Sequence, residues 1–155
     1  MGTGGYPRTD VRWPGSFGSA YLYFLVPRVI LFREEHTPRV FVPKVDFISA
    51  PGVSEPNVYR PGGPYALLTG KALFAFDKAR QRFRLETVHP GFSVADVEAS
   101  TGFEFDRTSH VDVTPAPEPE LLALLRGPVR DEVAETYPQF AATVMRGSDD
   151  KENRV

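Results

Sequence analysis

The stretch Tyr65-Ala-Leu-Leu-Thr-Gly-Lys-Ala-Leu-Phe-Ala-Phe-Asp-Lys-Ala-Arg-Gln-Arg-Phe-Arg-Leu-Glu-Thr-Val88 decides the fold. It holds three apolar segments of strand length, at 65–69, 72–76 and 81–88, and a short polar turn separates the last two. The segment 81–88 alternates apolar with polar residues, which predicts a strand with one face in water. The second and third segments are therefore predicted to form a β-hairpin.

Upstream of this hairpin the pattern is less regular. Residues 28–33 (Arg-Val-Ile-Leu-Phe-Arg) are continuously apolar and β-branched between two arginines, which predicts a buried strand. The apolar run 19–26 fits a short helix or a strand, and its periodicity does not decide between them. A second extended stretch is predicted over 39–48, followed by a loop rich in Pro and Gly over 49–64.

Downstream the hydrophobic period changes from that of strands to that of helices. Ser93 and Asp96 have the spacing of a capping box at the start of a helix, and Gly102 is predicted to end it in the left-handed conformation. A second helix is predicted over 118–126, with its four leucines on the buried side and a Gly-Pro pair as its stop. Residues 129–146 have a helical pattern interrupted by a proline. Strands that alternate with short helices predict the α/β class.

Composition limits the possible functions. The chain has 155 residues, enough for one domain, which we predict over residues 1–147 with a disordered tail over 148–155. The net charge of -2, without a basic stripe, argues against nucleic-acid binding. The absence of cysteine excludes disulfides and thiol nucleophiles and fits a cytoplasmic protein. No signal peptide is visible, and no apolar run is long enough for a membrane span, so we expect a soluble protein.

The common catalytic motifs are absent. The three histidines, at positions 36, 89 and 110, lack the close spacing of metal ligands, and we predict no metal site. Gly70-Lys71 lacks the other residues of a phosphate-binding loop, and Ser109-His110 lacks the context of a catalytic serine. These residues are interpreted as turn and loop positions.

One charged segment is a candidate binding site. Glu34, Glu35 and His36 directly follow the strand predicted over 28–33, and open α/β sheets bind their ligands at the carboxyl ends of strands. The alternative interpretation is an exposed charged turn. The residues alone do not choose between these two.

Four stretches, in the same order as in the family, resemble family I coenzyme A transferases of the β-subunit type, as in glutaconate CoA-transferase. They are Gly2-Thr-Gly-Gly5, Arg39-Val-Phe-Val-Pro-Lys-Val-Asp-Phe-Ile-Ser-Ala-Pro-Gly52, the segment from Gly63 to Phe76, and Val88-His-Pro-Gly-Phe-Ser93 continuing to Thr101-Gly-Phe103. Together they cover roughly residues 1–127. The resemblance implies an open, mainly parallel α/β sheet flanked by helices, with the CoA-transferase-like fold.

The family's chemistry uses a glutamate that attacks an acyl-CoA and then carries CoA as a thioester. The resemblance implies that Gly4 and Gly5, as part of the glycine-rich loop, and Glu35, in the strand-end turn, bind the substrate. His89 and Gly91 match the family as a turn between strand and helix. No cofactor is implied beyond the coenzyme A thioester, which is a substrate.

The family's nucleophilic glutamate lies upstream of its glycine loop, at which this chain begins. The resemblance therefore implies the C-terminal portion of a β-type subunit, with the N-terminal part of the family domain missing and the glutamate supplied by another segment or partner. We expect a hetero-oligomer with an α-type or complementary subunit, inactive on its own. Two alternatives stay open: a non-catalytic scaffold subunit of the same fold, and a subunit of a CoA-linked ring-cleavage hydrolase.

Overall fold

The computed structural model describes residues 2–3, 8, 10–12, 17–50 and 52–145 of the chain. Its contacts divide the chain into two compact units, Met1–Thr114 and Pro115–Val155. The predicted tail over 148–155 lies outside the described residues. The extent of a single domain over 1–147 stays a prediction.

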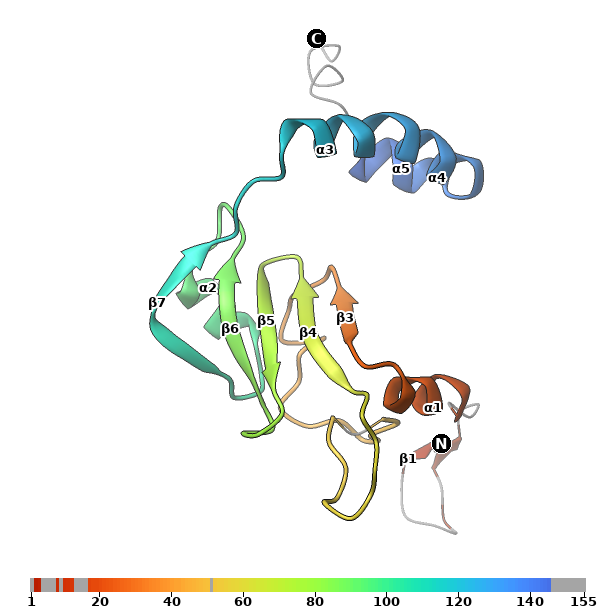
Figure 1. Cartoon of the computed structure of the whole chain (residues 1–155), viewed down its shortest axis with the longest axis vertical. Helices are drawn as coiled ribbons and strands as arrows, with labels where there is room; N and C mark the ends of the chain where they lie inside the picture. Colours follow the sequence, from red (N-terminus) through yellow and green to blue (C-terminus); the bar gives the residue numbers. More distant parts are fainter. Residues whose placement is uncertain (1, 4–7, 9, 13–16, 51, 146–155) are drawn as a thin grey trace. The chain divides into compact units, whose positions relative to one another are not determined.

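A five-stranded sheet forms the centre of the first unit (Figure 1). Its strands, in spatial order and in sequence order, are β3 (Val29–Arg33), β4 (Pro64–Thr69), β5 (Ala72–Asp77), β6 (Arg82–Val88) and β7 (Asp106–Val113). The pairings β3–β4 and β6–β7 are parallel, and the pairings β4–β5 and β5–β6 are antiparallel. Four strands therefore point in one direction and only β5 opposes them, which confirms the predicted mainly parallel α/β sheet.

The hairpin of β5 and β6 forms as the alternating sequence predicts, with Ala75 opposite Arg84 and Asp77 opposite Arg82. Its turn is stabilised by the Asp77 carboxylate, which accepts hydrogen bonds from the backbone N–H groups of Ala79 at 2.9 Å and Arg80 at 3.0 Å. This carboxylate satisfies two backbone donors that the reversal of the chain would otherwise leave unpaired. The turn lies at the edge of the sheet opposite the carboxyl ends of the other four strands.

One face of the sheet carries the hydrophobic core. The residues Leu31, Leu67, Phe74 and Leu85 occupy successive strands in one register row, so their side chains share this face. Helix α2 (Val94–Ser100) covers the face with Val97, which is fully buried, and the rings of Phe41, Phe103 and Phe105 pack around it.

Helix α2 begins with the predicted capping box. The Ser93 side chain accepts from the backbone N–H of Asp96, and the Asp96 carboxylate accepts from the backbone N–H of Ser93 at 2.8 Å. The turn before this helix contains Gly91 at φ 89°, which is the conformational role expected for that glycine.

Two expectations for the amino-terminal half need correction. Strand β3 forms but is not buried: it is an edge strand, only alternate side chains reach the core, and Phe32 is 68% exposed. The stretch 39–48 is irregular rather than a strand, because the chain turns as the N–H groups of Val40 and Phe41 bond to Thr37 O and Pro43 follows. The ambiguous run 19–26 lies largely in helix α1 (Phe17–Leu25).

Gly102 also differs from its expectation. Its φ lies outside the left-handed range. Glycine is needed at this position because a Cβ would collide with Phe41 O and with the ring of Pro43. Its own N–H donates to Phe41 O at 2.6 Å, which ties the end of α2 to the turn after β3.

The second unit consists of α3 (Pro119–Leu124), a π-helical turn η1 (Leu125–Val129), α4 (Arg130–Thr136) and α5 (Pro138–Val144). The predicted break falls at Gly127, whose φ and ψ are not helical. The leucines expected on a buried side are not buried, and Leu121 and Leu124 are 49% and 51% exposed. Within this unit α4 packs against α5, and the short helix α3, which contains Leu121 and Leu124, has no buried residue.

Near the amino terminus, β1 (Gly2–Thr3) and β2 (Val11–Arg12) form a small antiparallel pair. Among the described residues, no helix is both long and apolar enough to cross a membrane.

Candidate functional site

The carboxyl ends of β3, β4, β6 and β7 meet at one edge of the sheet, and the segments that follow them are joined through their backbones (Figure 1). The N–H of Gly70 donates to Glu34 O at 2.9 Å, and the N–H of His89 donates to Lys71 O at 2.7 Å. A Cβ at Gly70 would collide with Glu34 O, so only glycine permits this close approach. Because loops at this edge are where open α/β sheets hold their ligands, this is the candidate site.

His36 is at the centre of the site and is 4% exposed. Its Nδ1 lies 2.8 Å from Thr69 Oγ1 at the end of β4, and its Nε2 lies 2.9 Å from Thr101 Oγ1 at the end of α2. The imidazole thus joins three elements that are distant in sequence. A buried ring with both nitrogens hydrogen-bonded is stabilising and gives the edge a fixed geometry.

Both hydroxyls that bond to His36 are also bonded to the backbone. Thr69 Oγ1 already accepts from the N–H groups of Lys71 at 3.2 Å and Ala72 at 2.9 Å. Thr101 Oγ1 donates its proton to Val97 O at 2.7 Å. Thr69 Oγ1 likewise donates to Ala72 O at 2.9 Å, so each of the two hydroxyls beside the ring has a backbone carbonyl as an acceptor for its single proton.

The electrostatics agree with a neutral ring. Burial, together with the positive charge of Lys71, lowers the pKa of His36 from 6.5 to about 4. At neutral pH the ring is therefore uncharged. It stabilises the edge through hydrogen bonds and does not offer a positive charge to a substrate.

Lys71 provides the positive charge of the edge. Its ammonium donates to Ser100 Oγ at 2.6 Å, and that hydroxyl donates in turn to Asp96 O at 2.6 Å. Lys71 Nζ also lies 5.6 Å from the ring centroid of Phe92, within the range of a cation–π interaction. Among the described residues no carboxylate forms an ion pair with Lys71, although its charge, after the hydrogen bonds from Ser93, contributes to lowering the pKa of Asp96, so the ammonium can still contact an anionic group of a ligand.

His89 extends the polar layer toward β7. Its Nε2 lies 3.0 Å from Thr69 O, which only accepts, so Nε2 carries a proton and donates it. Its Nδ1 lies 2.8 Å from Thr114 Oγ1, which lies 2.6 Å from Thr87 Oγ1. The structural role expected of His89 at this turn is compatible with these bonds, and the bonds also link the ends of β4, β6 and β7.

Glu35 lies in the loop after β3, and its carboxylate is bonded within its own segment. Arg39 donates to both carboxylate oxygens at 2.8 Å, Arg33 donates to Oε2 at 3.0 Å, and Thr37 donates to Oε1 at 3.1 Å. The hydrogen bonds from Arg39 and Thr37 are the main reason that the pKa of Glu35 lies below its usual value. This carboxylate is held ionised and orients two guanidinium groups.

The predicted site residues differ in whether the structure describes them and in where they lie. Gly4 and Gly5 lie outside the described residues. Glu35 is at the expected edge, and its role in substrate binding stays a prediction. Sequence reasoning named His36 only as part of a charged turn and did not select Thr69, Lys71, Ser100 or Thr101. For two of them a signal was available, because Thr69 ends a predicted strand and Lys71 follows it, at the edge where strand ends meet.

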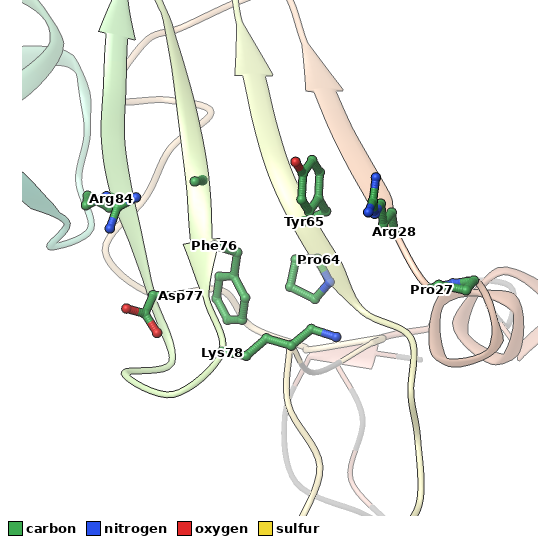
Figure 2. Close-up of a pocket in the computed structure, with 9 residues that line it drawn as sticks. Pro27, Arg28, Pro64, Tyr65, Phe76, Asp77, Lys78 and Arg84 are labelled. Atoms are coloured by element: carbon green, nitrogen blue, oxygen red, sulfur yellow. The ribbon is translucent and has the colours of Figure 1, made fainter.

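Within the described ranges, no group of three or more metal-ligating side chains comes together. A separate pocket of about 450 Å³ opens at the other edge of the sheet, where β3 and β4 begin (Figure 2). Figure 2 shows Phe76 beside Pro64 with Lys78 passing below them, Arg28 near Tyr65, and Arg84 on the neighbouring strand.

The class of protein is indicated by known relatives. Over 130 residues the chain is 30% identical to the B subunit of glutaconate CoA-transferase from Acidaminococcus fermentans, covering 79% of this chain and 48% of that protein. It is 32% identical over 129 residues to the B subunit of 3-oxoadipate CoA-transferase from Pseudomonas knackmussii, covering 78% of this chain and 49% of that protein. No protein-family model matches the chain.

Solved structures of related proteins have a similar fold. The crystal structure of the Acidaminococcus fermentans enzyme matches with a TM-score of 0.64 and 29% identity, over 82% of this chain and 50% of that one. The structure of IpdAB from Rhodococcus jostii RHA1 matches with a TM-score of 0.68 and 25% identity, over 81% of this chain and 52% of that one.

The chain is thus related in sequence and fold to two-subunit CoA-transferases and similar enzymes. Within that class its sequence is similar to those of CoA-transferase B subunits, including that of glutaconate CoA-transferase, as the resemblance of its motifs indicated. It spans about half the length of the relatives it matches, which is consistent with the expected C-terminal portion.

Proposed function

We propose that this chain is part of a B-type subunit of a CoA-transferase that moves CoA between an acyl-CoA and a carboxylic acid. The observation that carries the proposal is the match to two CoA-transferase B subunits over more than three quarters of the chain. We further propose that the nucleophilic glutamate comes from a segment or partner outside this chain. The complementary or α-type subunit and the acyl-CoA substrate are part of the same proposal.

The strand-end edge supports this reaction chemically. The glutamate attacks the thioester carbonyl and releases CoA thiolate, and the thiolate then attacks the glutamyl carbonyl of the resulting anhydride and releases the first acid. A second carboxylate reverses these steps, so the net change is the exchange of one acid for another on CoA. Each addition places negative charge on oxygen, and the Lys71 ammonium is one cation at this edge suited to stabilise it.

In this proposal the remaining residues have positioning roles. His36, Thr69 and Thr101 hold the edge rigid, and Glu35 fixes the guanidinium groups of Arg33 and Arg39, which are cations suited to an anionic ligand. The N–H groups of Gly4 and Gly5 are proposed as oxyanion donors, on the family resemblance alone.

The test is CoA exchange by the chain purified together with its complementary subunit, followed by mass spectrometry of the acyl-CoA products. We expect exchange to require both polypeptides and Lys71→Met to lower its rate by about a hundredfold or more, the scale of one lost oxyanion contact. Lys44→Met, at an exposed loop lysine, is the matched control. A complex that exchanges no CoA with any of a panel of acyl-CoA and acid pairs would overturn the proposal.

A second candidate is a hydrolase subunit. The chain is 31% identical over 96 residues to a cholesterol ring-cleaving hydrolase IpdB subunit of Rhodococcus jostii RHA1, covering 59% of this chain and 38% of that protein. The same assay separates the two functions, because a hydrolase consumes its CoA ester without an acceptor acid. A complex that does neither would favour the scaffold alternative.

A further inference from the structure

The aromatic ring of Phe92 lies beside Lys71 at the candidate site and takes no part in the hydrophobic core. Phe92 is the residue before the N-cap of α2, a position at which an apolar side chain commonly packs against the fourth residue of the helix. That residue is Val97, which is fully buried in the core cluster, whereas Phe92 lies outside the cluster and is 39% exposed. No aromatic pair among the described residues includes Phe92. Packing of the core therefore does not explain this ring.

The backbone is fixed on both sides of Phe92. Residues 89–92 form a tight turn in which the N–H of Phe92 donates to His89 O at 3.1 Å. Pro90 in its second position and Gly91 in its third, with φ 89°, are the residues that favour a type II turn. The capping box of α2 follows directly. A side chain held in this way is preorganised for a ligand, because little backbone entropy is lost on binding.

The neighbour of the ring is the Lys71 ammonium, and the fold sets the geometry of this pair. Lys71 Nζ lies 5.6 Å from the centroid of the Phe92 ring. The backbone of Lys71 is joined to the same turn, because its carbonyl oxygen accepts from the N–H of His89 at 2.7 Å. The bond from Nζ to Ser100 Oγ at 2.6 Å holds the ammonium in place. Such a pair combines two chemistries, since the cation attracts an oxygen with negative charge and the ring favours hydrocarbon over water.

We propose that Lys71 and Phe92 bind two parts of one acyl group, the ammonium its carbonyl oxygen and the ring its hydrocarbon, so that Phe92 selects acyl groups with an apolar chain. An oxygen bonded to Nζ lies about 3 Å from it and a carbon packs on a ring at about 4 Å, which together span the 5.6 Å between the two groups. A hydroxyl on the carbons next to the carbonyl would meet the ring and lose its hydrogen bonds to water. The selected class is thus an acyl-CoA such as butyryl-CoA, in preference to acetyl-CoA and 3-hydroxybutyryl-CoA. The inference rests on the proposed function, because its ligand is an acyl-CoA.

The contact is tested by fluorine NMR of the full chain, alone and with its complementary subunit, with p-fluorophenylalanine in place of Phe92. This label keeps the phenyl ring, so the test does not depend on the folding of a truncated variant. The matched control carries the same label in place of Phe76, which lines the separate pocket of Figure 2. We expect butyryl-CoA to move the resonance at position 92 further than acetyl-CoA or free CoA does, and to leave the resonance at position 76 unchanged. No movement at position 92, or equal movement with all three ligands, would overturn the inference.

Selectivity is tested by CoA exchange in the complex. Phe92→Ala should lower kcat/KM for butyryl-CoA about tenfold more than kcat/KM for acetyl-CoA, the scale of lost methylene contacts in an apolar site. Phe92→Leu, which keeps an apolar side chain, should retain most of the preference, whereas a ring with only a structural role would change both values by the same factor. Tyr59→Ala, which removes a ring that is 91% exposed, is the matched control for the ratio. An unchanged ratio in Phe92→Ala, or a wild-type complex that favours 3-hydroxybutyryl-CoA over butyryl-CoA, would overturn the inference.

Failure of the inference and failure of the proposed function are distinguishable. If the complex moves no CoA but butyryl-CoA selectively shifts the resonance at position 92, the acyl contact stands and the proposed function fails. If the complex exchanges CoA with the same selectivity after Phe92→Ala, the proposed function stands and the role of Phe92 is wrong.

Discussion

His36 is a titratable group whose surroundings favour its neutral form, and this has a consequence for stability. Between pH 6.5 and about 4 the unfolded chain binds a proton at this residue and the folded chain does not. The free energy of unfolding should therefore fall as the pH falls through this window, by up to about 3 kcal/mol.

Urea unfolding of the full chain from pH 7.5 to 4 measures this dependence, and the His36→Gln variant should lose that part of it. The matched control is His110→Gln, since the side chain of His110 is 85% exposed. Equal pH dependence in the wild-type chain and His36→Gln would contradict the neutral, buried ring.

Thr69 is the second residue on which the edge depends. Its Oγ1 accepts from two backbone N–H groups and bonds to His36, and the residue is 3% exposed. Thr69→Val keeps the shape but leaves these donors unsatisfied, so we expect a loss of about 3 kcal/mol in the free energy of unfolding. Thr136→Val, at an exposed position at the end of α4, should change it by less than about 0.5 kcal/mol. Denaturant unfolding measures both, and similar losses in the two variants would show that the hydroxyl of Thr69 has no special role.

At the scale of elements, the predictions succeeded where the signal is local. The hairpin and the capping box depend on residues within a few positions of one another, and both form as predicted. The burial of a side chain depends on its neighbours in the folded structure, which cannot be read from the local sequence pattern. Strand β3 has the composition of a central strand but lies at an edge, and the leucines after residue 120 have a buried pattern but remain half exposed.

The same distinction explains the candidate site. Its edge was predictable from strand ends, and Glu35 and His36 were noted for that reason. The contacts of His36 with Thr69 and Thr101 span 33 and 65 residues of sequence, and no local pattern encodes them.

The ends of β3 and β4 should be sensitive to a single methyl group. Gly70→Ala places a Cβ against Glu34 O, a backbone atom that moves only with its strand, so we expect a loss of about 2 kcal/mol or more. Gly18→Ala is the matched control, because it lies in helix α1 with no atom within 4 Å of its Cβ position. There we expect a gain of up to about 1 kcal/mol. Denaturant unfolding measures both, and a neutral Gly70→Ala would show that the two loops can separate at little cost.

For the whole molecule, we expect the isolated chain to carry out no CoA transfer, because the proposed nucleophile lies elsewhere. Incubation with an acyl-CoA followed by borohydride, which reduces a glutamyl thioester, should leave every glutamate peptide unmodified in mass spectrometry. The complex with its complementary subunit, treated in the same way, is the positive control. A modified peptide that contains Glu34 or Glu35 would show that the nucleophile is in this chain and that the proposed division of labour is wrong.

The turn between β5 and β6 has a practical consequence for such experiments. It lies at the edge of the sheet away from the candidate site, its side chain at Ala79 is exposed, and the chain contains no cysteine. Ala79→Cys would thus introduce a unique thiol, and the backbone bond that holds the turn would be kept. A fluorophore attached there would report on association with another polypeptide by anisotropy, while leaving the strand ends around His36 and Lys71 chemically untouched.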